Sequence, residues 1–286
     1  MPIGTPQIKV DSVWRLGTVD NVKYVDVILY GNNFDEAKVK CDEIAARDHL
    51  FYVAPFDNPY VIAGQGTIGI EILEELPDPD AVFVQIGGGG LASGISEYIK
   101  GKDNPPPGVK VIGVEGVGQN AMAKSIAAGH LDPLKEIDPF ADGTAVMVPA
   151  QSTFDICKIR LDPQPKPEIV LVTNDQLCSA IKDIFDGMSM PCSLQPARAD
   201  GFTDTRTVVE PSGAMALAGL KKYIADNNLK GKKLVAVISG ANMNFIRLRF
   251  VAQRAEFGDG QEALLSISNP NRFEYVSINH RFQSTN

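Results

Sequence analysis

The sequence predicts an α/β fold with a doubly wound parallel sheet. Short apolar runs rich in β-branched residues alternate along the chain with longer segments whose apolar residues recur at helical spacing. This alternation is typical of a parallel sheet that is covered by helices on both faces. The run at 81–86 ends in four consecutive glycines, which lead directly into a helical segment. Because ligands of such folds bind beyond the carboxyl ends of the strands, this turn is the first candidate for a site.

The composition is that of an ordinary globular protein and argues against several classes of partner. Of the 286 residues, 44% are apolar and 22% are charged, and the formal net charge is −8. The chain has no cluster of lysines or arginines, so we expect neither nucleic acid nor a membrane surface as a partner. The four cysteines and three histidines are scattered without disulfide or zinc spacing. This predicts core cysteines, no metal site, and a soluble protein of a reducing compartment.

The first part of the chain is expected to contain helices at 5–16 and 33–47 and strands at 24–30 and 50–53. In the first helix Ile8, Val10 and Val13 are the apolar positions. Residues 1–6 are typical of the end of a buried strand that runs into a turn, as if the chain began within a domain.

The central part is expected to contain helices at 67–76, 91–102 and 120–128 and strands at 81–86 and 109–115. Ile68 and Ile72 lie on one side of the first of these helices, and Leu91 and Ile95 on one side of the second. Gly129 is the signal that ends the third.

The last part is expected to contain strands at 169–173 and 234–238 and helices at 176–186 and 212–225. The polar residues Thr173, Asn174 and Asp175 cap the first of these helices. The segment 187–202 interrupts the alternation and has the character of an insertion, and residues 266–286 show no periodicity.

The glycine run is predicted to bind a phosphate. Glycine allows positive φ and a close approach of another group. A turn between a strand and a helix N-terminus directs free N–H groups and the positive end of the helix dipole at one point. The residues concerned are Gly87, Gly88, Gly89, Gly90 and Leu91. The alternative is a tight turn that binds no ligand.

The same residues permit a nicotinamide-binding interpretation. The spacing of Gly87, Gly89 and Ala92 matches a relaxed dinucleotide fingerprint, and Glu115 ends the next strand, where it could bind a ribose hydroxyl. In that fingerprint the acidic residue follows the glycines by roughly 20 residues, whereas Glu115 lies farther along the chain. The alternative is that Glu115 is a solvated residue at the end of the strand and binds no ligand.

A second candidate is Ser239, which follows a strand and precedes a small-residue turn. Its hydroxyl could meet a neutral ring nitrogen, whereas a carboxylate would hold such a nitrogen protonated. The alternative is a serine that caps a short following helix. The segment 210–214, Glu-Pro-Ser-Gly-Ala, is most simply a helix entry with its proline near the first position.

A series of motifs resembles the biosynthetic threonine deaminase family, whose members are fold-type II pyridoxal-phosphate (PLP) enzymes. The matching segments, in order, lie at 1–11, 33–37, 55–67, 87–91, 140–143, 210–214, 239–242 and 262–265. They include Pro-Phe-Asp at 55–57, Gly-Gly-Gly-Gly-Leu at 87–91 and Ser-Gly-Ala-Asn at 239–242. The segments at 33–37, 55–57 and 262–265 favour the threonine enzyme over serine racemase.

The resemblance implies a fold like that of the tryptophan synthase β subunit, with PLP as the cofactor. It assigns the PLP phosphate to Gly87–Gly90 and Leu91 and the pyridine nitrogen to Ser239. The implied reaction converts L-threonine to 2-oxobutanoate and ammonia, the first step of isoleucine biosynthesis, with serine as the alternative substrate. The position of Glu115 belongs to a cation site in the racemase branch, but a further ligand position of that site is Ala121 here, so no metal is expected.

Two motifs of the family do not occur in these 286 residues: Ser-Phe-Lys-x-Arg-Gly-Ala, which carries the lysine that binds PLP, and Ser-x-Gly-Asn-His. No catalytic residue is therefore assigned, and we expect a chain that is truncated at both ends and inactive alone. The lysines Lys9, Lys124, Lys182 and Lys221 lie on helical patterns typical of solvated faces. The expected organisation is the remainder of a small subdomain (1–50), a large PLP-binding subdomain (51–265) and an irregular tail (266–286) without a regulatory domain.

Three alternatives to the threonine enzyme stay open at this stage. They are a serine dehydratase or racemase, a non-catalytic remnant that associates with a full-length subunit, and an NAD-dependent dehydrogenase. The resemblance also implies a homo-oligomer for the complete protein. The sequence alone does not assign a compartment; a reducing one is expected, either the cytoplasm or, in a eukaryote, a plastid or the mitochondrial matrix.

Overall fold

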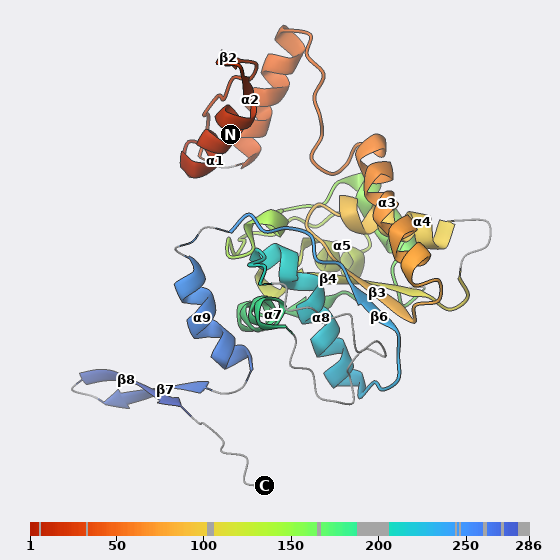
Figure 1. Cartoon of the computed structure of the whole chain (residues 1–286), viewed down its shortest axis with the longest axis vertical. Helices are drawn as coiled ribbons and strands as arrows, with labels where there is room; N and C mark the ends of the chain where they lie inside the picture. Colours follow the sequence, from red (N-terminus) through yellow and green to blue (C-terminus); the bar gives the residue numbers. More distant parts are fainter. Residues whose placement is uncertain are drawn as a thin grey trace. The chain divides into compact units, whose positions relative to one another are not determined.

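The computed structural model describes most of the chain in helices, strands and connecting segments (Figure 1). The described residues are 1–5, 7–32, 34–101, 106–164, 167–187, 206–243, 245, 247–259, 262–269 and 272–279. They divide into two compact units, Met1–Ala54 and Pro55–Asn286. The predicted subdomain boundary after residue 50 stays a prediction.

The first unit contains two helices and a two-stranded ribbon. These are α1 (Gln7–Leu16), β1 (Thr18–Val19), β2 (Val22–Lys23) and α2 (Phe34–Arg47). Of the predicted apolar positions of α1, Val10 is buried whereas Ile8 is exposed.

The two strands predicted in the first unit, at 24–30 and 50–53, are wrong. Both segments are irregular. The segment 24–30 bonds to the start of the chain, with Tyr30 N donating to Met1 O and Ile3 N donating to Gly31 O, both at 2.8 Å. A strand needs a neighbour that continues the ladder of hydrogen bonds, and these isolated bonds do not provide one.

The second unit is built on a four-stranded parallel sheet with the order β5-β4-β3-β6. The strands are β3 (Ala81–Gln85), β4 (Lys110–Gly116), β5 (Val170–Val172) and β6 (Leu234–Ala236). Every residue of β3 is buried, as expected of a central strand that is covered on both faces. The predicted α/β fold with a doubly wound parallel sheet is confirmed.

Alternate residues of β3 face two separate cores. Val82, Val84 and Ile86 pack with α3 (Pro59–Glu75), α4 (Gly90–Gly101), α5 (Ala121–Ala128) and α6 (Gln151–Arg160). Ala81 and Phe83 pack with α7 (Asn174–Asp186), α8 (Pro211–Asn227) and α9 (Arg247–Gly258). The period of two along a strand therefore divides the helices into two layers.

Several predicted helix boundaries are confirmed by capping contacts. Thr173 forms a capping box with Gln176 at the start of α7, and Gly129 ends α5 in the left-handed region with φ 81°. Helix α3 begins earlier than predicted, because Asn58 accepts a hydrogen bond from Tyr60 N at 2.9 Å and Pro59 occupies the first turn.

The sequence prediction missed α6, α9 and a hairpin of β7 (Glu262–Asn269) and β8 (Arg272–Asn279). The hairpin corrects the irregular tail predicted from residue 266, because its two strands pair in antiparallel register from Glu262↔Asn279 to Asn269↔Arg272. Gly187 ends α7, and the rest of the predicted insertion at 187–202 lies outside the described residues. In the part of the chain that the structure describes, no helix combines the length and apolar character needed to cross a bilayer.

Helices α3 and α4 approach each other so closely that two glycines face across the contact. A Cβ on Gly94 would overlap Ile62 O and would lie 2.7 Å from Gly66 N, and a Cβ on Gly66 would lie 3.2 Å from Gly94 O. We expect Gly94→Ala to force the helices apart and to lower the free energy of unfolding by about 1–3 kcal/mol. Chemical denaturation measures this change.

The control is Gly64→Ala in α3, where a Cβ would have no neighbour within 4 Å. Alanine favours the helix, so this variant should be as stable as the unaltered chain or more stable by about 0.5–1 kcal/mol. Equal effects of the two substitutions would contradict the close contact of α3 and α4.

Candidate functional site

The glycine turn and the Ser239 turn lie side by side at the carboxyl edge of the sheet. Strands β3 and β6 are parallel neighbours in the register Phe83↔Ala236, and Val237 N continues the ladder by donating to Phe83 O at 3.1 Å. The chain leaves β3 into Gly87 and leaves β6 into Ser239. Two predicted site segments that are far apart in the sequence therefore meet at one edge.

Each position of the glycine turn is in contact with another part of the chain. A Cβ on Gly87 would lie 2.9 Å from Thr144 Cα, and a Cβ on Gly88 or Gly90 would overlap Phe56. Gly89 has φ +93°, and its Cβ would lie 2.8 Å from Thr153 Cβ. Side chains are excluded here by packing alone, so the glycines have a structural reason that is independent of any ligand.

The turn nevertheless presents backbone donors. Thr153, which is fully buried in α6, places its Oγ1 2.6 Å from Gly88 O and donates to it. In a trans peptide the C=O and the following N–H point in opposite directions, so the N–H of Gly89 points away from α6. The first hydrogen bond of α4 runs from Ser93 N to Gly89 O at 2.8 Å. The N–H groups of Gly90 and Leu91 precede that bond and have no partner within the helix.

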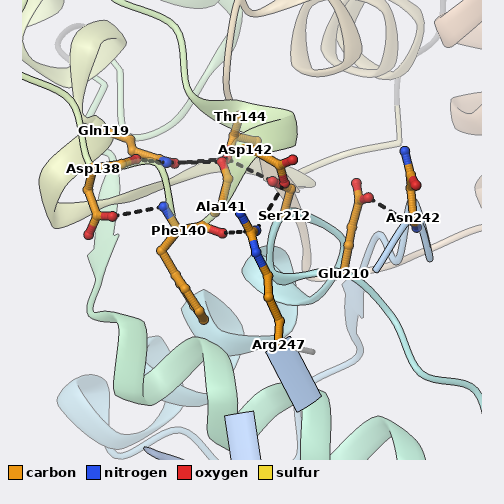
Figure 2. A network of polar contacts seen from close by, with 10 residues as sticks. All are labelled: Gln119, Asp138, Phe140, Ala141, Asp142, Thr144, Glu210, Ser212, Asn242 and Arg247. Atoms are coloured by element: carbon orange, nitrogen blue, oxygen red, sulfur yellow. Dashed lines mark hydrogen bonds and ion pairs between the residues drawn. The ribbon is translucent and has the colours of Figure 1, made fainter. Parts of the chain in front are cut away.

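The Ser239 turn is held against the start of α8 by Glu210. Glu210 N donates to Gly240 O at 3.0 Å, and the Glu210 carboxylate accepts from Asn242 N at 3.1 Å (Figure 2). Ser239 itself is exposed at the tip of the strand. No helix begins at Ser239, because residues 239–243 are irregular, so the interpretation of Ser239 as a helix cap is wrong. The predicted helix entry at 210–214 is confirmed, with Pro211 as the first residue of α8.

A buried polar network connects Thr144, which packs against Gly87, with Gln119 and with Ser212 at the start of α8 (Figure 2). Thr144, in the 3-10 helix η2 (Asp142–Thr144), donates to Gln119 Oε1 at 3.0 Å and lies 3.1 Å from Ser212 Oγ. Gln119, in η1 (Val117–Gln119), donates to Ala141 O at 3.0 Å and also to Asp138 O. Sequence reasoning missed Gln119 and Thr144, although Gln119 follows the carboxyl end of β4, where site residues of this fold gather.

The segment 138–144 is also fixed to two helices on the α8 face of the sheet. Arg247 of α9 donates to Phe140 O at 2.9 Å and lies 3.4 Å from Asp142 Oδ1 (Figure 2). Asn174 of α7 donates to Asp138 Oδ2 at 2.7 Å. These bonds hold the irregular segment that lies against Gly87 in one position.

Glu115 is neither a solvated residue at the end of a strand nor free to bind a ribose hydroxyl. Its side chain is buried in β4, and its carboxylate accepts from Met122 N at 2.9 Å and from Ala123 N at 2.8 Å, at the start of α5. Burial raises the pKa of this carboxyl from 4.5 to about 8, although the two backbone donors favour the charged form. Among the described residues, no group of three histidine, cysteine or acidic side chains is arranged to hold a metal ion.

The cysteine prediction is confirmed for two residues. Cys157 and Cys178 are buried, and burial raises the pKa of each thiol to about 12, so neither is a nucleophile at neutral pH. Cys41 is exposed, which corrects its prediction as a core residue, and Cys192 lies outside the described residues.

Lys182 and Lys221, two of the lysines predicted on solvated faces, remain about one third exposed and form ion pairs, as Lys124 does with Asp132 at 3.2 Å. Lys182 lies 2.8 Å from Asp259 Oδ2, and Lys221 pairs with Asp183 and donates to Ser179 Oγ at 2.7 Å. These contacts join α7, α8 and the end of α9, and they occupy both amines.

Comparison with known proteins identifies a family and a group of relatives. Residues 1–240 match the sequence model of a family described as "Pyridoxal-phosphate dependent enzyme". The chain is 41% identical over 282 residues to the biosynthetic L-threonine dehydratase of Haemophilus influenzae, a match that covers 96% of this chain and 49% of the relative. It is 44% identical over 276 residues to the mitochondrial threonine dehydratase of Schizosaccharomyces pombe, covering 95% of this chain and 41% of that protein.

The same group is found among solved structures. The processed form of threonine deaminase isoform 2 from Solanum lycopersicum superposes with a TM-score of 0.76 at 40% identity, and the match covers 90% of this chain and 62% of that one. The chain thus spans less than half the length of the two curated relatives.

The residues at the carboxyl edge fit PLP. The backbone N–H groups of the glycine turn suit a phosphate ester, and the close packing of Phe56, Thr144 and Thr153 fixes the turn in this form. Ser239 lies on the adjacent strand end, where the other end of a ligand bound at the turn could reach it. The assignment of Gly87–Gly90, Leu91 and Ser239 to the cofactor stays a prediction.

The bond from Thr153 to Gly88 should control phosphate binding. Thr153→Val keeps the shape of the side chain but removes the donor that orients the Gly88–Gly89 peptide. We expect the affinity for PLP, measured by titration of its absorbance, to fall roughly 10-fold, since one hydrogen bond and its orientation are lost. Thr153→Ser retains the hydroxyl and should bind as the unaltered chain does. Equal affinities of the valine and serine variants would contradict this role.

The buried carboxyl of Glu115 should make stability depend on pH. Because its pKa is about 8 in the folded chain and 4.5 ordinarily, the folded state retains a proton that the unfolded state releases between these values. The free energy of unfolding should therefore fall as pH rises from about 5 to 8, by up to about 1.4 kcal/mol per pH unit from this group. Urea denaturation at several pH values measures it.

Glu115→Gln is the matched variant, since glutamine does not titrate. Its free energy of unfolding should be less dependent on pH across this window, although it should be lower at pH 5 because one backbone donor loses its acceptor. Identical pH profiles of the two chains would show that Glu115 does not retain its proton.

Proposed function

The chain belongs to the pyridoxal-phosphate dependent enzyme family, and we propose on that premise that it forms the cofactor-binding part of a threonine ammonia-lyase. The observation that carries this proposal is the junction of two turns at one sheet edge. The glycine turn offers backbone donors for a phosphate, and Ser239 offers a hydroxyl on the neighbouring strand end. The family match favours PLP over a dinucleotide, and Glu115, engaged at the start of α5, is not available for a ribose.

When bound, PLP supplies an electron sink for the bonds at the α-carbon of an amino acid. The residues of this chain bind and orient it. The N–H groups of Gly89, Gly90 and Leu91 hold the phosphate through the polarity of the α4 N-terminus. The hydroxyl of Ser239 meets the ring nitrogen without the negative charge that would keep that nitrogen protonated. Glu210 holds the Ser239 turn in place through its bonds to Gly240 and Asn242.

The proposed reaction is the conversion of L-threonine to 2-oxobutanoate and ammonia, which supplies isoleucine biosynthesis. It rests on the names of relatives at 41–44% identity, which are biosynthetic or mitochondrial threonine dehydratases. Serine is the alternative substrate, since a serine racemase of Dictyostelium discoideum superposes with a TM-score of 0.65 at 25% identity.

The 286 residues contain no Ser-Phe-Lys sequence, and Lys182 and Lys221 are engaged in ion pairs. We therefore propose that this chain binds PLP without a covalent bond and does not turn threonine over alone. A lysine amine is the nucleophile that such a bond requires. We further propose that the protein forms a homo-oligomer and is located in the cytoplasm, the mitochondrial matrix or a plastid; the names of two relatives, one mitochondrial and one chloroplastic, support the two organelles.

The test titrates the purified chain with PLP, follows the absorbance of the cofactor, and assays 2-oxobutanoate after threonine is added. We expect binding without the spectrum of a covalent lysine adduct and no 2-oxobutanoate. Ser239→Ala should weaken PLP binding roughly 2- to 10-fold, because one hydrogen bond is lost. Lys230→Ala is the control, since this exposed residue precedes β6 in the same unit, at the end of the strand opposite to Ser239, and it should leave the affinity unchanged.

Three results would contradict the proposal. Absence of PLP binding would reject the cofactor site, and robust production of 2-oxobutanoate would reject the proposed inactivity of the chain. Equal affinities of Ser239→Ala and the unaltered chain would reject the role of Ser239.

A further inference from the structure

We propose that Gln85 is a further cofactor-binding residue, whose side-chain amide bonds to the ring end of PLP. This inference rests on the proposed function. Gln85 is the last residue of β3 and is only 4% exposed. Both its Nε2 and its Oε1 are buried without a hydrogen-bond partner among the described residues.

A buried amide with neither of its polar atoms paired is rare in folded proteins. The great majority of buried polar atoms have a partner, and leaving one unpaired destabilises the folded state. A group that is retained under this penalty is explained most directly by a partner that the protein chain does not itself provide.

Burial at this edge does not by itself leave a glutamine unpaired. Gln119, which is 3% exposed, lies just beyond the carboxyl end of the neighbouring strand β4. Its amide nitrogen donates to Ala141 O at 3.0 Å, and its oxygen accepts from Thr144 Oγ1 at 3.0 Å. Among the described residues, one buried glutamine is therefore paired within the chain and the other is not.

The position of Gln85 points to the cofactor site. Gln85 follows Phe83 on the face of β3 that packs on α8, and it pairs in register with Val114 of β4. Toward the core its neighbours on this face are therefore apolar. In the other direction lie Gly87, two residues on, and the continuation of β6 toward Ser239. We therefore infer that the polar group that pairs with the amide comes from that edge.

The amide suits the ring end of PLP because it both donates and accepts while staying uncharged. A pyridine nitrogen accepts a hydrogen bond, and a ring hydroxyl does both. Since the phosphate end is held by the glycine turn, the ring is the part that a residue beside the end of β6 meets. Gln85 and Ser239 would then both form hydrogen bonds to the ring, and the glycine turn would bind the phosphate.

The test compares Gln85→Met with Gln119→Met, two substitutions that replace a buried amide by an apolar side chain of similar length. For Gln85→Met we expect a melting temperature of the ligand-free chain equal to or above that of the unaltered chain, because an unpaired amide is removed. We expect its PLP affinity to fall about 10-fold. Its affinity for inorganic phosphate, measured by competition with PLP, should be unchanged. Gln119→Met should lower the melting temperature, because paired groups lose their partner.

The results that would overturn the inference are distinct from those that would overturn the proposed function. If the unaltered chain does not bind PLP, both fail. If it binds PLP and Gln85→Met binds equally well, the inference alone fails. A fall in melting temperature for Gln85→Met that matches that for Gln119→Met would assign Gln85 a structural partner and also reject the inference. Weakened binding of inorganic phosphate would place the effect at the glycine turn and reject contact with the ring.

Discussion

The parallel pairing of β3 with β4 and β6 is the constraint on which the site depends. In a parallel sheet all strands end at the same edge, so segments that follow β3, β4 and β6 converge although they are far apart in the chain. The glycine turn, Gln119 and Ser239 are brought together in this way. Their chemistry differs, but their positions follow from one pattern of backbone hydrogen bonds.

The close packing of the turns against neighbouring segments is the second constraint on the structure of the site. Gly88 and Gly90 lie against Phe56, Gly87 lies against Thr144, and Gly213 lies against the backbone of Gly240. A side chain at any of these positions would separate the turns that form the site. Packing alone therefore requires these glycines, which is why their presence did not distinguish a phosphate site from a tight turn.

Buried polar groups at this edge fall into two classes. Glu115 and Gln119 are paired within the chain, by the start of α5 and by the segment 138–144, and they fix those segments. Gln85 has no such partner in the described part of the chain. Burial, which raises the pKa of Glu115 on the α5 face of the sheet, also makes the unpaired amide of Gln85 on the α8 face unfavourable.

The sequence by itself determined the alternation of strands and helices, the glycine turn and the helix caps at Thr173 and Gly129, because each is encoded in residues close together along the chain. A series of such short segments also carried the family resemblance. Sequence reasoning misassigned 24–30, 50–53 and the tail, because a strand exists only where a partner pairs with it. Only the tertiary structure decided that Glu115 is buried and that Thr153 orients the Gly88 peptide. It also decided that, among the residues it describes, Gln85 has no hydrogen-bond partner while Gln119 has several. Burial and hydrogen-bond partners depend on residues far apart in the sequence, and no local pattern specifies them.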